Sequence, residues 1–114
     1  MNSQQQQKLF EEGVELFNRG NYFECHEVWE SLWKAEPEPD RQFTQGLIQI
    51  AVATYHLRRN NLAGALKLYR RGCDRLRAFT PACRGVNVAA LVSSIEPVLA
   101  GGARAPQLQI QRSE

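Results

Sequence analysis

The residues best suited to chemistry lie close together in residues 20–33. This run holds a histidine, three glutamates and two tryptophans. His26 and Glu30 are four positions apart, so in a helix they share a face and can form a hydrogen-bonded pair. An imidazole beside a carboxylate can transfer protons or bind a metal ion. The run is half of a candidate site, and the other half must come from elsewhere in the chain.

A second set of polar residues supplies the missing half. Gln45, Gln49 and His56 fall within an arc of about 40° on a helix that is otherwise apolar almost all round. Polar groups inside a protein are costly unless they are hydrogen-bonded, so these side chains need partners on a neighbouring helix. The short connector before this helix makes the helix of His26 its antiparallel neighbour. We therefore expect a polar seam inside the bundle, made of His26, Glu30, Gln45, Gln49 and His56.

This seam has three interpretations. His26, Glu30 and His56 could bind a divalent metal ion such as zinc, manganese or iron. Alternatively, Glu30 orients His26 as a metal-free general acid or base, although no Ser, Thr or Lys stands in the seam as a nucleophile. In the third interpretation the seam is a hydrogen-bond network that fixes the helix register. The candidate catalytic residues are His26, Glu27, Glu30, Gln49 and His56.

Hydrophobic periodicity predicts five helices and no competing strand pattern. The expected helices cover residues 5–17, 21–36, 41–59, 62–79 and 87–97. Gly13 lies in the apolar stripe of the first helix, which indicates that a neighbouring helix approaches closely there. The third helix is apolar almost all round and should be the central one. The fold class is therefore all-α, a compact bundle of two antiparallel helical hairpins and a short C-terminal helix.

A faint internal repeat supports the two hairpins. Residues 18–25 and 58–65 join two helices through similar turns that are forty positions apart. Such hairpins resemble tetratricopeptide units, although that repeat needs about three copies for stability. This geometry leaves open an alternative function as a helical protein–protein interaction module, with a homodimer or another protein as partner and a purely structural seam.

Length and composition predict a single domain. The chain has 114 residues, of which 43% are hydrophobic. We expect a polar N-terminal tail at 1–7, one helical domain at 8–99 and a flexible C-terminal tail at 100–114. No apolar run reaches the roughly 20 residues of a membrane span, and the first residues do not resemble a signal peptide, so a cytoplasmic location is expected. The three cysteines are an odd number without a Cys-x-x-Cys pair, which favours buried thiols.

Charge is distributed unevenly along the chain. Residues 58–84 carry eight basic side chains and a single acidic one, whereas residues 1–57 carry nine acidic and four basic ones. A basic block can bind an anionic partner. The basic fourth helix could therefore bind nucleic acid or a phosphorylated ligand. Its arginines are not interleaved with aromatic residues except Tyr69, which belongs to the core, and this argues against nucleic acid as the partner.

The paired motifs resemble a known family. Residues 17–33 read FNRGNYFECHEVWESLW, and residues 45–56 read QGLIQIAVATYH. These stretches are similar to the signature of a small bacterial and archaeal domain of unknown function, family three-oh-nine of that series. The likeness covers roughly residues 8 to 99.

This resemblance implies an all-helical bundle. Members of the family are sometimes labelled predicted metal-dependent hydrolases, which implies a metal ion as cofactor. The polar residues that the motif carries over are Glu24, His26, Glu27, Glu30, Gln45, Gln49 and His56. One departure is Asn87, where the family pattern has an aspartate, and either residue can cap a helix.

Overall fold

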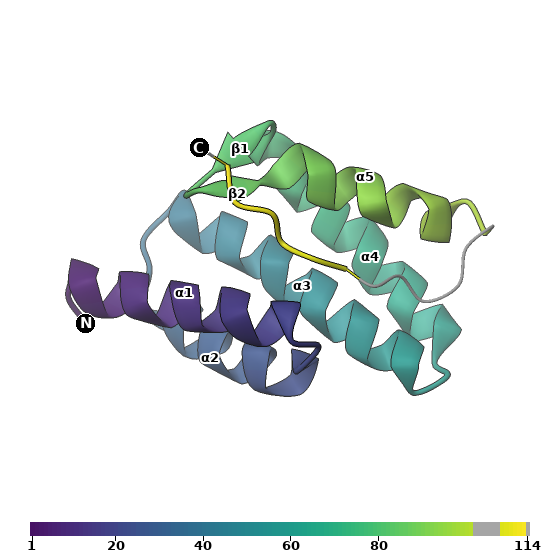
Figure 1. The fold of residues 1–114 in the computed structure, drawn as a ribbon, viewed down its shortest axis with the longest axis horizontal. Coiled ribbons are helices and arrows are strands. Elements are labelled where there is room, and N and C mark those ends of the chain that lie inside the picture. The colour runs from purple at the N-terminus through teal and green to yellow at the C-terminus, as the bar shows by residue number, and fades with distance from the viewer. Residues whose placement is uncertain (102–107, 114) are drawn as a thin grey trace.

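Four long helices follow one another through short turns, and the third lies between its neighbours. The computed structural model describes residues 1–101 and 108–113, and Figure 1 shows their arrangement. The helices of this part are α1 (Ser3–Asn18), α2 (Tyr22–Ala35), α3 (Asp40–Arg58), α4 (Leu62–Leu76) and α5 (Val88–Leu99). The central helix α3 packs against both α2 and α4. The predicted all-α bundle is confirmed.

Glycines allow the helices of each hairpin to approach closely. A Cβ atom on Gly13 would lie 1.9 Å from Nε1 of Trp29, so the indole of α2 occupies the space where a side chain of α1 would be. Nε1 of Trp29 donates to the backbone oxygen of Phe10 at 3.2 Å. Between α3 and α4, a Cβ on Gly72 would lie 3.1 Å from the backbone oxygen of Gly46. The expected close approach at Gly13 is thus present, with Trp29 as the residue that fills it.

A small hairpin precedes α5. After a 3-10 turn at Arg77–Phe79, strands β1 (Ala82–Cys83) and β2 (Val86–Asn87) pair antiparallel, with Cys83 opposite Val86. The two-residue loop between them has positive φ angles, 50° at Arg84 and 74° at Gly85. Two positive φ angles are typical of the type I′ turns that match the twist of paired strands. The sequence pattern did not predict these strands, because two residues are too few to show an alternation.

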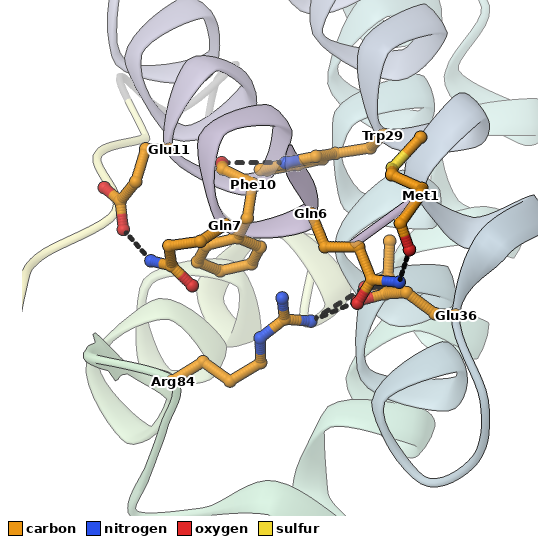
Figure 2. A network of polar contacts seen from close by, with 9 residues as sticks. Met1, Gln6, Gln7, Phe10, Glu11, Trp29, Glu36 and Arg84 are labelled. Atoms are coloured by element: carbon orange, nitrogen blue, oxygen red, sulfur yellow. Dashed lines mark hydrogen bonds and ion pairs between the residues drawn. The ribbon is translucent and has the colours of Figure 1, made fainter. Parts of the chain in front are cut away.

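The hairpin is tied to the helices by a buried ion pair. Nη1 of Arg84 lies 2.5 Å from Oε2 of Glu36, and the hydroxyl of Thr44 donates to Oε1 of Glu36 at 2.5 Å. The Glu36 side chain is only 1% exposed and that of Arg84 is 17% exposed. The Arg84 guanidinium also lies over the ring of Phe10, 4.3 Å from its centre. Figure 2 shows Arg84 reaching toward Glu36 beside Phe10. One pair therefore joins the β-hairpin to α1, to α3 and to the end of α2.

Both termini differ from the expected tails. Helix α1 begins at Ser3, because the side chain of Asn2 accepts a hydrogen bond from the backbone N–H of Gln5 and caps it. Near the C-terminus, Leu108 and Ile110 are buried, so this part of the expected flexible tail packs on the core. The side chain of Asn18 hydrogen-bonds both backbone groups of Ile110, at 2.7 and 3.2 Å. The segment runs beside β2 and between α5 and α1 (yellow in Figure 1). Residues 102–107 and 114 of the expected tail lie outside the described residues.

In the described part of the chain, no helix combines the length and the apolar character that crossing a membrane requires.

Candidate functional site

A cavity of about 390 Å³ lies over α3, between α2 and α4. This volume is within the range of pockets that hold small organic ligands. Its walls combine polar and aliphatic side chains from all three helices: His26, Glu30 and Trp33 of α2, Gln45, Ile48, Gln49 and Val52 of α3, and Leu68 and Arg71 of α4. We call this cavity the central pocket. Four of the five residues predicted to form the polar seam line it.

His26 and Glu30 form the expected pair on one face of α2. Nε2 of His26 lies 2.9 Å from Oε2 of Glu30, and Nδ1 lies 3.3 Å from the backbone oxygen of Phe23. Both partners are acceptors, so a neutral imidazole can donate to one of them and an imidazolium to both. The His26 side chain is 27% exposed and that of Glu30 is 46% exposed. The pair therefore lies at the solvent-facing wall of the pocket and not inside the bundle.

Gln49 is the buried member of the seam, with 7% of its surface exposed. Its Oε1 accepts a hydrogen bond from Nε of Arg75 at 3.1 Å. The expectation that α2 supplies the partner for this buried amide is therefore wrong. The partner comes from α4, because Gly46 and Gly72 let α3 and α4 pack closely enough for Arg75 to reach across. The sequence signal for Arg75 was its place in the basic block at residues 58–84.

His56 and Glu27 lie outside the central pocket. His56 lines a neighbouring cavity of about 200 Å³, whose other walls are mainly aromatic and which touches the central pocket at His26 and Val52. Glu27 is exposed and lines neither cavity. The candidate catalytic set of the sequence is thus brought together only in part: His26, Glu30 and Gln49 share one pocket.

Among the described residues, the carboxylates and imidazoles do not form a metal-binding cluster. Across residues 1–101 and 108–113, no three His, Cys, Asp or Glu side chains are grouped so that they could hold a metal ion. His26, Glu30 and His56 are therefore not such a group, and the zinc, manganese or iron site inferred from sequence stays a prediction. A catalytic zinc site uses three protein ligands. The described lining of the central pocket offers one imidazole and one carboxylate, those of His26 and Glu30, so its donor set does not fit a catalytic zinc ion.

The tryptophans have different surroundings. Trp29 is fully buried and stacks near the rings of Phe10 and Phe17. Trp33 is half-buried and forms part of the pocket wall, with the guanidinium of Arg41 lying 4.0 Å from the centre of its ring. Trp29 therefore holds α2 against α1, while Trp33 shapes the pocket.

The two buried cysteines do not contribute to the site. Burial raises the pKa of the Cys25 thiol above its usual range, and burial raises the pKa of Cys73 to about 11. Sγ of Cys25 donates to the backbone oxygen of Gly13 at 3.2 Å. Thiols that stay protonated at neutral pH are poor nucleophiles and metal ligands. The prediction of buried thiols is confirmed for both residues.

Comparison with known proteins identifies the family. The model of a domain of unknown function (DUF309) matches residues 10–68, which is just over half of the chain. The chain belongs to this family. The DUF309 match covers all of α2 and α3 and ends within α4, before Arg71 and Arg75. It therefore includes all five residues of the predicted seam: His26, Glu30, Gln45, Gln49 and His56.

A relative within the curated proteins has a similar segment. The chain is 46% identical over 66 residues to the uncharacterized protein YpuF of Bacillus subtilis (strain 168). The matched segment is 57% of this chain and 38% of YpuF, so the chain spans well under half the length of that relative. The family match and this relative carry no stated function, so the function has to be argued from the pocket.

Proposed function

We propose that this protein binds a small organic ligand in the central pocket and that His26, oriented by Glu30, exchanges a proton with it. The observation that carries the proposal is the 2.9 Å contact between His26 and Glu30 at the wall of a ligand-sized pocket. An imidazole is the side chain best suited to gain and lose a proton near neutral pH, and a carboxylate partner fixes its orientation.

The rest of the pocket supports binding of a partly polar ligand. Gln45 and Gln49 can donate and accept hydrogen bonds, while Ile48, Val52 and Leu68 offer apolar surface. Five of the nine lining residues are polar or charged, so the pocket offers hydrogen-bonding groups and apolar surface together, which suits a ligand with both. The described lining contains no Ser, Thr, Cys or Lys, so a reaction there would use water or a group of the ligand itself as nucleophile.

Two observations favour this function over those left open by the sequence. A metal-dependent hydrolase needs a cluster of metal ligands, and the described residues form none. A structural network would satisfy its polar groups within the protein, yet the His26–Glu30 pair faces a cavity and keeps part of its surface exposed.

The test is a ligand screen by NMR on ¹⁵N-labelled protein, using small acids, bases and neutral compounds. We expect binders to shift resonances of α2 and α3, and His26→Gln to weaken their binding about 10- to 100-fold, as loss of a hydrogen bond from a charged group does. Glu27→Gln is the matched control, since Glu27 lies on the same helix but lines neither cavity. This control should bind as the wild type does.

Three results would refute the proposal. The first is binding that His26→Gln leaves unchanged. The second is binding that His56→Gln abolishes and His26→Gln does not, which would move the site to the aromatic cavity. The third is tight binding of Zn²⁺ or Mn²⁺ alone, lost in both His26→Gln and Glu30→Gln, which would restore the metal interpretation.

A further inference from the structure

A third cavity also adjoins the central pocket and has a different charge. Its volume is about 260 Å³, and it shares Trp33 and Gln45 with the central pocket. The remaining walls are charged or amide side chains: Glu38, Arg41, Gln42 and Arg75. We call it the arginine pocket. A ligand in the central pocket can therefore extend past Trp33 and Gln45 into a cavity with two guanidinium groups.

Arg75 is held in this cavity by neutral partners. Its Nε donates to Oε1 of Gln49 at 3.1 Å, and its Nη1 donates to Oε1 of Gln42. A guanidinium has five N–H donors, so these two bonds leave others for a ligand. Gln49 lines the central pocket, so Arg75 also connects the two cavities physically. The side chain is fixed in position without its charge being neutralised.

Arg41 is fixed in a different way. Its guanidinium stacks on Trp33, 4.0 Å from the ring centre. Its Nε is buried and has no hydrogen-bond partner among the described residues. A buried donor without a partner costs free energy, and most such groups in proteins are satisfied by protein, water or ligand. Arg41 is thus oriented by stacking while part of its hydrogen-bonding capacity is unused.

The arginine pocket has an excess of positive charge. In residues 1–101 and 108–113, neither Arg41 nor Arg75 forms an ion pair with a carboxylate. Glu38 is the acidic residue of the cavity wall, and its Oε1 accepts a hydrogen bond from the Gln42 amide at 3.1 Å. Arg71, one helical turn before Arg75, adds a further positive charge at the central pocket. Two guanidiniums and one carboxylate therefore surround the cavity.

We propose that the arginine pocket binds an oxyanion group, a carboxylate or a phosphate, of the ligand whose remainder occupies the central pocket. This inference rests on the proposed function, because it names the class of ligand for the same site. Planar guanidiniums match carboxylate and phosphate oxygens and can donate two hydrogen bonds at once. The substrate class is then a small organic acid or phosphate ester that also carries a hydrogen-bonding group beside His26 and an apolar part against Ile48, Val52 and Leu68.

The experiment compares phenylacetate and phenyl phosphate with the neutral analogue phenylacetamide, each carrying a 4-hydroxyl group that can hydrogen-bond to His26, and each titrated into the protein by NMR or calorimetry. We expect at least one anion to bind about tenfold or more tightly than phenylacetamide, as charge-assisted hydrogen bonds are stronger than neutral ones. Whichever anion binds more tightly identifies the oxyanion. Arg41→Gln and Arg75→Gln should each remove most of this preference.

Arg70→Gln is the matched control, since Arg70 is exposed on the same helix as Arg75 and lines neither pocket. It should keep the full preference for the anion. Arg75→Lys is a second variant, which retains the charge and loses the fork of donors. It guards against a loss of folding in Arg75→Gln, and thermal melts of all variants complete the comparison.

The outcomes separate the two proposals. If phenylacetamide binds as tightly as both anions and binding needs His26, the arginine pocket proposal is wrong and the proposed function stands. If an anion binds through Arg41 and Arg75 but His26→Gln has no effect, the proposed function is wrong and the oxyanion site stands. Failure of both anions to bind at millimolar concentration refutes the oxyanion site. Tighter binding of an oligonucleotide, weakened equally by Arg70→Gln, would instead assign these arginines to a nucleic-acid surface.

Discussion

The buried ion pair between Glu36 and Arg84 provides a sharp test of how the hairpin is attached to the helices. We consider the substitution Arg84→Met, which retains the length and apolar stem of the side chain and removes its charge. The backbone at Arg84 has a φ of 50°, and arginine and methionine bear a similar steric cost there. The change in stability therefore reports on the guanidinium and not on the turn.

The expected magnitude follows from burial. With Arg84 in place, the Glu36 side chain is only 1% exposed. Loss of the guanidinium leaves the Thr44 hydroxyl as the remaining side-chain partner of this carboxylate among the described residues. Removing one partner of a buried pair costs about 3 to 5 kcal/mol, because an uncompensated charge is left inside. We expect about 3 kcal/mol, at the lower end, since Arg84 is 17% exposed and its removal lets water reach the carboxylate. A loss of this size lowers the Tm by roughly 12 °C.

The assay is urea denaturation followed by the fluorescence of Trp29 and Trp33, with the free energy of unfolding extrapolated to zero denaturant. Glu36→Gln and the double variant complete a double-mutant cycle. We expect the double variant to lose about 2 kcal/mol less than the sum of the single variants, because no unpaired charge is left when both groups are neutral. Arg19→Met is the control, since Arg19 pairs with Glu15 where both side chains are more than half exposed.

Two results would refute this reasoning. One is a loss in Arg84→Met that is no larger than that of Arg19→Met, which would mean that the buried pair behaves like a surface pair. The other is simple addition of the two single effects in the double variant, which would mean that Glu36 and Arg84 are not coupled.

Two further predictions concern the core. Gly13→Ala should destabilise the protein by about 2 kcal/mol in the same urea assay, because the new methyl overlaps the Trp29 indole at a cost of about 3 kcal/mol, of which the helix-propensity gain offsets about 1 kcal/mol. A variant as stable as the wild type would disprove the close packing. Burial raises the pKa of Tyr69 to about 12, while its hydrogen bond to Thr54 opposes the shift. The neutral phenol is thus favoured in the folded state, so the stability it contributes is complete below the ordinary pKa of about 10 and is lost as the pH rises toward 12. Urea midpoints measured from neutral to alkaline pH should fall more steeply for the wild type than for Tyr69→Phe, and parallel curves would contradict the shift.

The helices could be predicted from the sequence because their signals are local. The apolar spacing of each helix, and the turns that separate them, lie within a few residues of each other. The largest difference in the helical part is at the end of α4, which stops at Leu76 and continues as a 3-10 turn to Phe79. The β-hairpin and the packed segment at 108–113 were not predicted, because they depend on contacts with residues far away in the chain, such as Asn18 and Glu36.

The sequence predicted which side of each helix carries the candidate site residues, but not which cavity each of them lines. The sequence predicted that Gln45, Gln49 and His56 lie along one side of a single helix, and α3 is a continuous helix over these positions. His56, however, lies seven residues beyond Gln49, which is about 10 Å along a helix, and it therefore lines the neighbouring cavity. The pairing of Arg75 with Gln49 could not be inferred, since the register of α4 against α3 is not encoded in the spacing of either helix alone.

By itself, the sequence determined which residues are helical, which faces of those helices are apolar, and that His26 and Glu30 share a face. These properties follow from the fixed rotation of about 100° per residue, which any helix imposes on its own side chains. The tertiary structure alone decided that the polar seam faces a cavity at the surface, that His56 stands apart from it, and that Arg41 and Arg75 meet beside Trp33. Long-range packing sets how two helices align along their axes and how deeply each side chain is buried. The positive charge of the arginine pocket could therefore be recognised only from the packed helices.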